Sequence, residues 1–262
     1  MTPALETRSL VKAFGGFVAT DHVSLTLAPG ARHALIGPNG AGKTTLINLL
    51  TGVLTPSSGA VLLDGADVTR LPRHARVRRG LARTFQINQL FRDMTAIESV
   101  ALAIAQRERR AAVWWRTARR ETAIADEAAA LLSSLGLADV LARPTAELAY
   151  GRQRLVELAL ALACRPRVLL LDEPAAGVPH GERDEILAVV AALPRDVTVL
   201  LIEHDMDLVF RFAERITVLV AGKLLVEGTP EAVAADPRVR QVYLGEQVSL
   251  GEKISLGEAG HG

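Results

Sequence analysis

The sequence predicts an α/β fold with a core of mostly parallel sheet, an antiparallel β subdomain and an inserted α-helical subdomain. Short, largely apolar segments at 168–171, 197–202 and 216–220 are typical of strands buried on both faces of a parallel sheet. Between residues 95 and 141, alanine, leucine and charged residues recur at helical spacing, and strand signals are missing. A glycine-rich loop at 37–42 separates an apolar strand from a helix, as expected in an α/β core.

The antiparallel subdomain is predicted from extended patterns near 4–11, 23–27 and 60–63. Asp64-Gly65 supplies a tight turn after the third of these patterns. The sequence therefore predicts that these segments pair in an antiparallel sheet.

The glycine-rich loop has the composition of a phosphate-binding loop. It follows an apolar run at 33–36 and precedes a helical pattern at 45–50, which is the context that the motif requires. Glycines let several backbone N–H groups point at one phosphate chain, and the helix N-terminus adds partial positive charge. Lys43 is expected to reach the β- and γ-phosphates, and the Thr44 hydroxyl to ligate Mg²⁺. The sequence thus predicts a P-loop core that binds a nucleotide. Its predicted nucleotide-binding residues are Gly37, Pro38, Asn39, Gly40, Ala41, Gly42, Lys43, Thr44 and Thr45.

The inserted helical subdomain is expected at about 87–165. Its pattern at 121–135 predicts a helix that Gly136 ends. Trp114 and Trp115 lie within the insert, and neighbouring helix positions point about 100° apart, so at most one ring can face the core fully. Packing with partial exposure and contact with a partner or membrane surface both remain open for this pair.

Composition excludes several classes of function. The chain has 262 residues, 49% hydrophobic and 23% charged, which is typical of a globular protein. A formal net charge of +1 gives no argument for a whole-surface nucleic-acid binder. Cys164 is the single cysteine, so neither a disulfide framework nor a cysteine metal cluster can be built. We expect a cytoplasmic protein, because no signal core and no run of ~20 apolar residues is present.

Two acidic residues stand at the end of the strand predicted at 168–171. Ligands bind at the carboxyl ends of strands in α/β sheets. Asp172 lies at the strand tip, where it can hold Mg²⁺ directly or through water. Glu173 points elsewhere and is placed to accept a proton from an attacking water. The pair becomes a strong signal because the chain already contains a phosphate loop.

His204 and Gln86 complete the predicted catalytic set. His204 follows the apolar strand at 197–202, where its imidazole can hydrogen-bond a γ-phosphate. Gln86 ends the segment 81–85, and a neutral amide there can ligate Mg²⁺ or position water. Glu173, His204 and Gln86 are the expected catalytic residues, and Thr44, Gln86 and Asp172 the expected metal ligands.

A second anion site is expected near Gly151, at the start of the apolar helical pattern at 155–164. One chain cannot easily wrap both sites around one nucleotide. We therefore expect two chains, each offering this helix end to the γ-phosphate on the other.

With these elements in this order, the chain resembles the ATP-binding subunit of an ABC transporter. The resemblance covers nearly everything from Leu5 to Gly245 and is greatest for the branched-chain amino acid uptake group. The motifs that carry it are Phe14-Gly15-Gly16, Ala82-Arg83-Thr84-Phe85-Gln86, Leu171-Asp172-Glu173-Pro174-Ala175-Ala176-Gly177, Leu201-Ile202-Glu203-His204-Asp205-Met206 and Tyr243-Leu244-Gly245.

The resemblance assigns further roles. Phe14 would stack on adenine, Gln86 would be the Q-loop residue and His204 the switch histidine. Residues 176–179 would form the D-loop. Residues 87–99, including Phe91 and Met94, would face the coupling helix of a membrane subunit. The signature loop, which would contact the partner's nucleotide, would comprise Ala149, Tyr150, Gly151, Arg152 and Gln153.

Three positions depart from the common pattern. Ala149 replaces the usual serine of the signature, Arg152 replaces a glutamine, and Pro179 stands where many D-loops have aspartate. A serine hydroxyl would donate to the γ-phosphate across the dimer, and loss of one such donor costs ~3 kcal/mol at an oxyanion site. The departures predict an asymmetric pair in which the site using this chain's signature is the weaker one.

The resemblance implies an ATP-binding domain at 4–245. The short Leu-Gly-Glu repeat at 244–258 separately predicts a poorly ordered tail at 246–262. The resemblance also implies ATP-powered uptake of branched-chain amino acids or a related small amide or urea-like solute. The expected partners are membrane permease subunits, a second ATP-binding subunit and, indirectly, a periplasmic or extracellular solute-binding protein. The chain would lie peripherally on the cytoplasmic face of the inner or plasma membrane, without a nucleic-acid partner.

Three alternatives stay open at this stage. The segment 71–76 also fits ABC ATPases that export lipid or lipopolysaccharide. Ala149 and Arg152 would suit a weakly hydrolysing regulatory subunit, although Glu173 and His204 argue against one. A soluble ABC protein acting on ribosomes or DNA would usually carry two cassettes or a coiled-coil insert, and this chain has one cassette and no sustained heptads.

Overall fold

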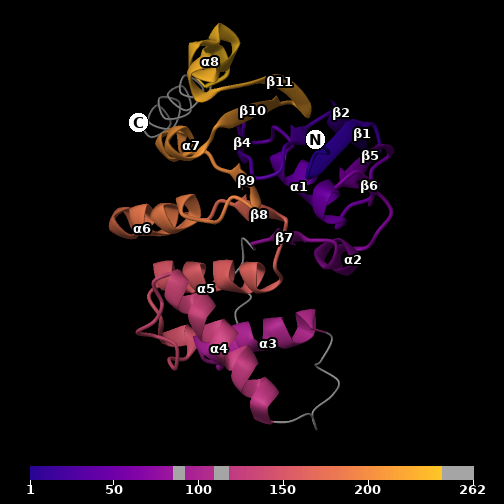
Figure 1. Cartoon of the computed structure of the whole chain (residues 1–262). Helices are drawn as coiled ribbons and strands as arrows, with labels where there is room; N and C mark the ends of the chain where they lie inside the picture. Colours follow the sequence, from indigo (N-terminus) through magenta and orange to yellow (C-terminus); the bar gives the residue numbers. More distant parts are fainter. Residues whose placement is uncertain (85–91, 109–117, 244–262) are drawn as a thin grey trace, which may run out of the picture.

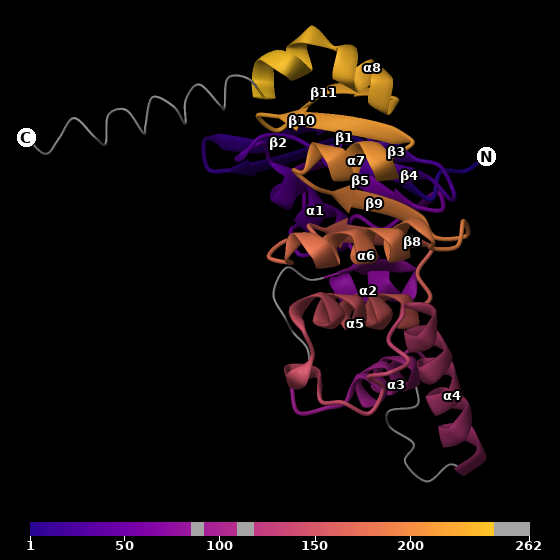
Figure 2. The same cartoon turned by 90° about the vertical axis from the view of Figure 1, so that its left-hand side faces the viewer.

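The computed structural model describes residues 1–84, 92–108 and 118–243 of the chain. The predictions for Phe85, Gln86, Phe91, Trp114-Trp115 and the tail lie outside these residues. Within them, two sheets and a group of helices form the layers visible in Figures 1 and 2.

The larger sheet has the strand order β11-β10-β4-β9-β8-β7. Every neighbouring pair is parallel except β10 and β11, which are antiparallel. The mostly parallel core expected from the apolar segments is therefore confirmed. Its strands are β4 (Arg32–Ile36), β7 (Leu81–Arg83), β8 (Val168–Asp172), β9 (Thr198–Ile202), β10 (Arg215–Val220) and β11 (Lys223–Gly228).

Both faces of this sheet are covered, which explains why its central strands lack polar alternation. Every residue of β4, β8 and β9 is buried. Leu170 and Leu200 pack in the cluster that contains α1 (Lys43–Thr51), whereas Leu169 and Leu171 pack in the cluster with the helical group. Alternate residues of β8 thus pack into two different hydrophobic cores, one on each face of the sheet, and the strand holds the two cores in a fixed relative position.

The smaller sheet is antiparallel, as predicted, with β1 pairing with β2, β3 and β5, and β5 with β6. Asp64 and Gly65 have φ of 49° and 77°, the positive values that a tight hairpin turn requires. The strands are β1 (Leu5–Phe14), β2 (Phe17–Val23), β3 (Thr26–Leu27), β5 (Ser58–Leu63) and β6 (Ala66–Asp67).

The expectation of one strand at 23–27 is wrong. β2 ends at Val23 and β3 begins at Thr26. Between them, the Thr7 hydroxyl accepts from Leu25 N at 2.8 Å and donates to Val23 O at 3.0 Å. A side chain from the neighbouring strand has taken over these hydrogen bonds, and it interrupts the strand in a way that the local pattern does not reveal.

The helical group contains α3 (Ala96–Arg107), α4 (Ala118–Ser134), the 3₁₀ turn η1 (Thr145–Glu147) and α5 (Tyr150–Ala163). Figure 1 shows these helices at the end of the molecule opposite β10 and β11. The helix expected at 121–135 begins earlier and ends at Ser134, and Gly136 follows with a φ of 76°. The remaining helices cover the sheets: α2 (Arg73–Arg78), α6 (His180–Ala191), α7 (Met206–Phe212) and α8 (Pro230–Ala235).

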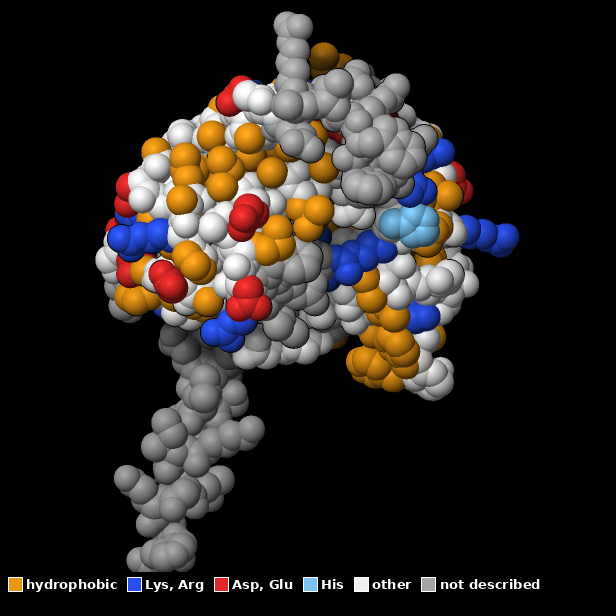
Figure 3. Space-filling model, turned by 90° about the horizontal axis from the view of Figure 1, so that it is seen from below, with side chains coloured by type: hydrophobic (Ala, Val, Ile, Leu, Met, Phe, Trp, Pro, Cys, Tyr) orange, Lys and Arg blue, Asp and Glu red, His pale blue; other side chains and the backbone are white. Residues whose placement is uncertain are grey.

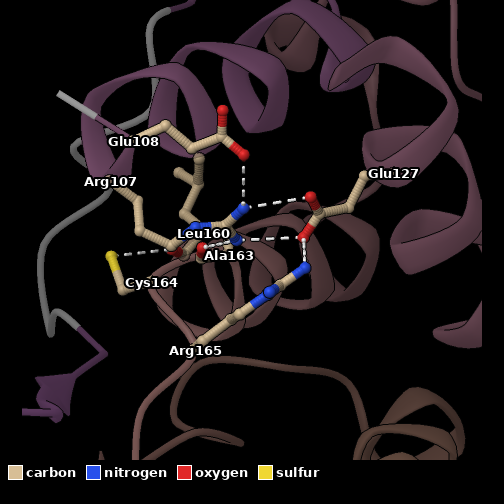
Figure 4. Close-up of polar contacts among 7 residues, drawn as sticks. All are labelled: Arg107, Glu108, Glu127, Leu160, Ala163, Cys164 and Arg165. Atoms are coloured by element: carbon tan, nitrogen blue, oxygen red, sulfur yellow. Dashed lines mark hydrogen bonds and ion pairs between the residues drawn. The ribbon is translucent and has the colours of Figure 1, made fainter. Parts of the chain in front are cut away.

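An ion-pair network fastens the helical group together (Figure 4). The guanidinium of Arg107 on α3 makes two hydrogen bonds, of 2.9 and 3.0 Å, to the carboxylate of Glu127 on α4. Arg107 also donates to Ala163 O at the end of α5, and Arg165 donates to Glu127 at 2.9 Å. The Arg107 hydrogen bonds hold the pKa of Glu127 below its ordinary value.

A buried arginine joins α1 to the segment around α2. Arg76 is 1% exposed and donates to four carbonyl oxygens, two of them at the end of α1 and two in the 69–71 segment. Gly52 makes room for it, because a Cβ there would lie 2.7 Å from Arg76 Nε. Arg76 satisfies helix-terminal carbonyls that would otherwise be left without a donor.

Candidate nucleotide site

The phosphate loop runs from the end of β4 to the start of α1. Gly40 and Gly42 have φ of 77° and 98°, a region that favours glycine. Gly42 is the N-cap residue of α1, and a Cβ there would lie 2.5 Å from Ala19 O. The backbone angle and the close packing of β2 therefore both require glycine at position 42.

Lys43 folds back across this loop. Its Nζ donates to Gly37 O at 2.5 Å and to Pro38 O at 3.0 Å. The amide of Gly222 donates to Ala41 O at 2.8 Å, which anchors the loop to the β10–β11 turn. These contacts hold the ammonium against the loop backbone, where it can meet a phosphate chain.

The exposed part of the loop contains Asn39 and Gly40, and Thr44 is exposed in the first turn of α1. Thr45 is half-buried beside it, whereas Gly37 and Ala41 are buried. Helix α1 begins at Lys43 and has no acidic residue in its first turn, so nothing there offsets the partial positive charge of its N-terminus. This surface suits an anion.

The register of β8 and β9 brings the predicted catalytic acid and histidine together. Asp172 lies opposite Ile202, and Glu173 N donates to Ile202 O at 2.9 Å. Glu173 has a φ of 48°, which turns the chain at the strand tip. The Nδ1 atom of His204 is 3.7 Å from Glu173 Oε1, and the imidazole is 68% exposed. Both groups can therefore meet a solute from outside.

Asp172 is held by Arg83, and Arg83 in turn by Asn48, two residues to which the sequence analysis assigned no role. Arg83 Nη2 lies 2.5 Å from Asp172 Oδ2, and Arg83 Nη1 donates to Asn48 Oδ1 at 2.9 Å. Asn48 belongs to α1 and Arg83 to β7, so the contact links three elements at the nucleotide edge. The parallel pairing of Arg83 with Leu170 would have indicated the contact, because Leu170 and Asp172 share a face of β8.

Glu203 is a third residue to which the sequence analysis assigned no role. It is 2% exposed, and burial raises the pKa of its carboxyl. Its Oε2 accepts from His204 N at 3.2 Å and lies 3.8 Å from His204 Nδ1. The imidazole is therefore placed between Glu203 and Glu173, and the buried carboxyl fixes the backbone that carries it. The signal that could have predicted this role is the position of Glu203, an acidic residue directly before the histidine at the end of β9.

The expected second anion site lies at the start of α5. Ala149 is its N-cap residue and makes no side-chain cap hydrogen bond. Gly151 N donates to Glu182 Oε2 at 3.0 Å. Arg152 forms an ion pair with Asp139, at 2.6 Å. The other two residues of the loop also have internal contacts, since Gln153 Nε2 donates to Leu148 O and Tyr150 Oη accepts from Arg154.

Comparison with known protein families gives two matches. Residues 20–176, which span the phosphate loop and Asp172-Glu173, match the family described as ABC transporter. The chain belongs to the ABC transporter family. Residues 223–249 of this ABC cassette also match the description "Branched-chain amino acid ATP-binding cassette transporter". The resemblance inferred from the motifs is thereby confirmed.

Curated relatives cover nearly the whole cassette. It is 42% identical over 253 residues to the high-affinity branched-chain amino acid transport ATP-binding protein BraF of Pseudomonas aeruginosa, covering 93% of this chain and 98% of the relative. Identity to LivG of Escherichia coli is 41% with the same coverage. A probable LivG of Methanocaldococcus jannaschii is 33% identical over 250 residues, covering 92% of this chain and 97% of the relative.

Solved structures bear out the fold. An ATP-binding cassette of an ABC transporter in its ADP conformation superposes with a TM-score of 0.80 at 31% identity, covering 94% of this chain and 100% of the other. A nucleotide-free cassette gives 0.79 at 31% identity, covering 92% and 98%. The predicted α/β P-loop ATPase core is confirmed, and the chain is an ATP-binding ATPase subunit of an ABC complex with membrane permease partners.

Phe14 lies at the tip of the β1–β2 hairpin of the cassette, paired with Phe17. Its side chain is 48% exposed, and the Lys12 ammonium lies 5.1 Å from the ring centre. The hairpin borders the phosphate loop through the contact of Ala19 O with Gly42. An exposed aromatic ring in this position can stack on a purine.

Two further predictions concern Gln86 and Met94. Gln86 lies outside the described residues, so its place among the catalytic groups stays a prediction. Met94 is described and half-buried. No helix of the described residues is long and apolar enough to cross a membrane.

Proposed function

We propose that this chain is the ATP-hydrolysing subunit of a membrane transporter that imports branched-chain amino acids, or a related small amide or urea-like solute. One observation carries the catalytic part of the proposal: His204 Nδ1 lies 3.7 Å from Glu173 Oε1, just beyond the ends of β9 and β8. The names of the relatives support the solute class, because BraF and LivG are called branched-chain amino acid transport ATP-binding proteins.

In this proposal Glu173 accepts the proton of the water that attacks the γ-phosphate of ATP. His204 hydrogen-bonds the γ-phosphate, and Lys43 contacts the β- and γ-phosphates. Gln86 positions water beside them. The remaining residues of the phosphate loop bind the phosphates through their backbone, and Phe14 stacks on adenine.

The donor set also fits Mg²⁺. The Thr44 hydroxyl and the Asp172 carboxylate are hard oxygen ligands of the kind that this ion prefers, and Gln86 would add an amide oxygen. Arg83 binds Asp172 Oδ2 and thereby orients the carboxylate, leaving Oδ1 for the ion or its water. When bound, Mg²⁺ neutralises charge on the β- and γ-phosphate oxygens.

The second half of each ATP site would come from another ATP-binding subunit, because the α5 end belongs to the helical group rather than to the phosphate-loop layer (Figure 1). The cassette would span residues 4–245, with the helical insert at about 87–165. Ala149 provides no hydroxyl, and Arg152 is paired with Asp139. Both observations support the prediction that the ATP site using this chain's signature loop is the weaker of the two. Equal ATP turnover per intact site in homodimer and heterodimer would contradict this asymmetry.

A permease would dock at the cleft between α2 and the ends of α3 and α5. The cleft measures about 1160 Å³, and arginine is the commonest residue in its lining. Arg73, Arg78, Arg79 and Arg167 lie along it, with Asp64 as the acidic member. Figure 3 views the helical end of the molecule, where hydrophobic and charged side chains are interspersed. The basic lining would favour an acidic permease segment.

The cassette would then lie on the cytoplasmic face of the membrane, with a solute-binding protein acting outside.

ATP turnover of the purified chain and of a Glu173→Gln variant, each alone and with its partner subunit, tests the catalytic assignment. The substitution should abolish turnover and leave ATP binding intact, because it removes the base and keeps the shape. Glu185→Gln is a matched control, since Glu185 is exposed on α6. Turnover that persists in the Glu173→Gln variant would overturn the assignment of the base, and negligible turnover in every mixture would overturn hydrolysis itself.

A further inference from the structure

A carboxylate of the chain itself lies on the first turn of α5. Gly151 N donates to Glu182 Oε2 at 3.0 Å. A Cβ built on Gly151 would collide with the same oxygen and would lie 3.3 Å from Glu182 Cβ. Glu182 is therefore packed directly against the glycine and binds an amide at the α5 end, which the expected two-chain site would offer to a partner's γ-phosphate.

The sequence explains why Glu182 is available for this contact. Helix α6 has Pro179 as its N-cap residue, so Glu182 occupies the third helical position. A glutamate at that position usually accepts a hydrogen bond from the N–H of the N-cap residue, forming half of a capping box. Proline has no N–H, and α6 has no side-chain cap hydrogen bond. Glu182 is thus free of its usual local partner and reaches α5.

Neighbouring contacts join this carboxylate to the D-loop. A Cβ on Gly177 would lie 3.3 Å from the ring of Tyr150, so the D-loop backbone packs on the residue before Gly151. Tyr150 in turn is held by Arg154, whose guanidinium donates to its hydroxyl at 2.6 Å. The chain passes from Gly177 through Pro179 into α6. A movement of Glu182 away from Gly151 would therefore also move the D-loop.

We propose that Glu182 is a positioning residue that occupies the α5 amide in the separated chain and leaves it when a partner's ATP arrives. The inference rests on the proposed two-chain ATP site. Carboxylate and γ-phosphate are both anions that compete for one N–H, and two anions in contact repel. Glu182 therefore keeps the first turn of α5 formed without nucleotide, and it raises the ATP concentration at which two chains close.

The test uses the full chain carrying Glu173→Gln, in which the ATP-bound pair accumulates because hydrolysis stops. ATP-dependent association is followed by light scattering or sedimentation. Adding Glu182→Gln or Glu182→Ala should lower the half-maximal ATP concentration roughly two- to fivefold, the size expected when one anion leaves a helix N-terminus. Glu185→Gln makes the same charge change on the same helix and should leave the midpoint unchanged.

A second variant approaches the contact from the other side. Pro179→Ser restores an N–H and a side-chain oxygen at the N-cap of α6, which gives Glu182 its local partner. It should also lower the half-maximal ATP concentration. Hydrogen exchange in the nucleotide-free chain should show faster exchange of the Gly151 amide in Glu182→Ala and no change in Glu185→Gln.

If Glu182 only stabilised the fold, Glu182→Ala would have a lower unfolding temperature, and Glu182→Gln would keep the same half-maximal ATP concentration for association. That result would overturn the inference. Association at equal ATP concentrations in all variants overturns the inference and leaves the proposed function standing. Absence of ATP-driven association in every variant overturns the two-chain site together with the inference.

Discussion

His33 provides a prediction whose magnitude follows from the structure. It lies in β4, is 1% exposed, and its Nε2 is 2.7 Å from Thr217 Oγ1. Burial lowers the pKa of His33 from 6.5 to about 4, and Arg215 acts in the same direction while Glu227 opposes it. The imidazole therefore stays neutral in the folded chain at pH values where the unfolded chain binds a proton.

The sign and size follow from proton linkage. Well above pH 6.5 His33 is neutral in both states and contributes no pH dependence. As the pH falls from 6.5 to about 4 the unfolded state takes up a proton and the folded state does not, so the free energy of unfolding decreases. A difference of about 2.5 pKa units at 1.36 kcal/mol each gives a loss of about 3 kcal/mol.

Urea denaturation between pH 4 and 7.5 measures this effect. Wild type and His33→Gln are compared, because glutamine can still hydrogen-bond Thr217 and does not titrate. Subtracting the two profiles isolates the His33 contribution from the other acid-sensitive groups. Wild type should lose about 3 kcal/mol more than the variant over this range. His74→Gln, which alters an exposed histidine of α2, should follow the wild-type slope. Parallel profiles for wild type and His33→Gln would refute the reasoning.

Three further substitutions have definite expected outcomes. Gly42→Ala should lower ATP affinity at least tenfold in equilibrium binding, since its φ of 98° disfavours alanine, whereas Gly16→Ala, with open space around it, should bind normally. Arg76→Met should reduce the free energy of unfolding by about 3 kcal/mol in urea, because buried carbonyls lose their donor; a loss below 1 kcal/mol would contradict that role. Arg83→Lys should raise the Mg²⁺ concentration needed for half-maximal turnover several-fold by loosening Asp172, and an unchanged requirement would exclude this orienting role.

Local signals were enough for much of the fold and part of the candidate site. The phosphate loop is contiguous, and its strand–loop–helix context could be recognised within about 20 residues. Glu173 and His204 each follow an apolar strand, and parallel strands end at one edge of the sheet, so their proximity could be expected before the register was known.

Other contacts depend on the register between distant segments. Arg83 meets Asp172 across 89 positions of the chain, and Glu182 meets Gly151 across 31. The interruption between β2 and β3 similarly depends on Thr7, a residue of another strand. Local periodicity contains no information about which neighbour a side chain will reach.

The buried guanidinium of Arg76 has a mechanical consequence. It bonds the last turn of α1 at Leu49 and Leu50, and its own helix, α2, lines the basic cleft. Helix α1 is nine residues long, about 14 Å, and begins at the phosphate loop. Arg76 therefore ties α2 to one end of α1, and the predicted phosphate loop lies at the other end. If a permease segment docks at the cleft as proposed and shifts α2, the shift would be transmitted through Arg76 and α1 to that loop.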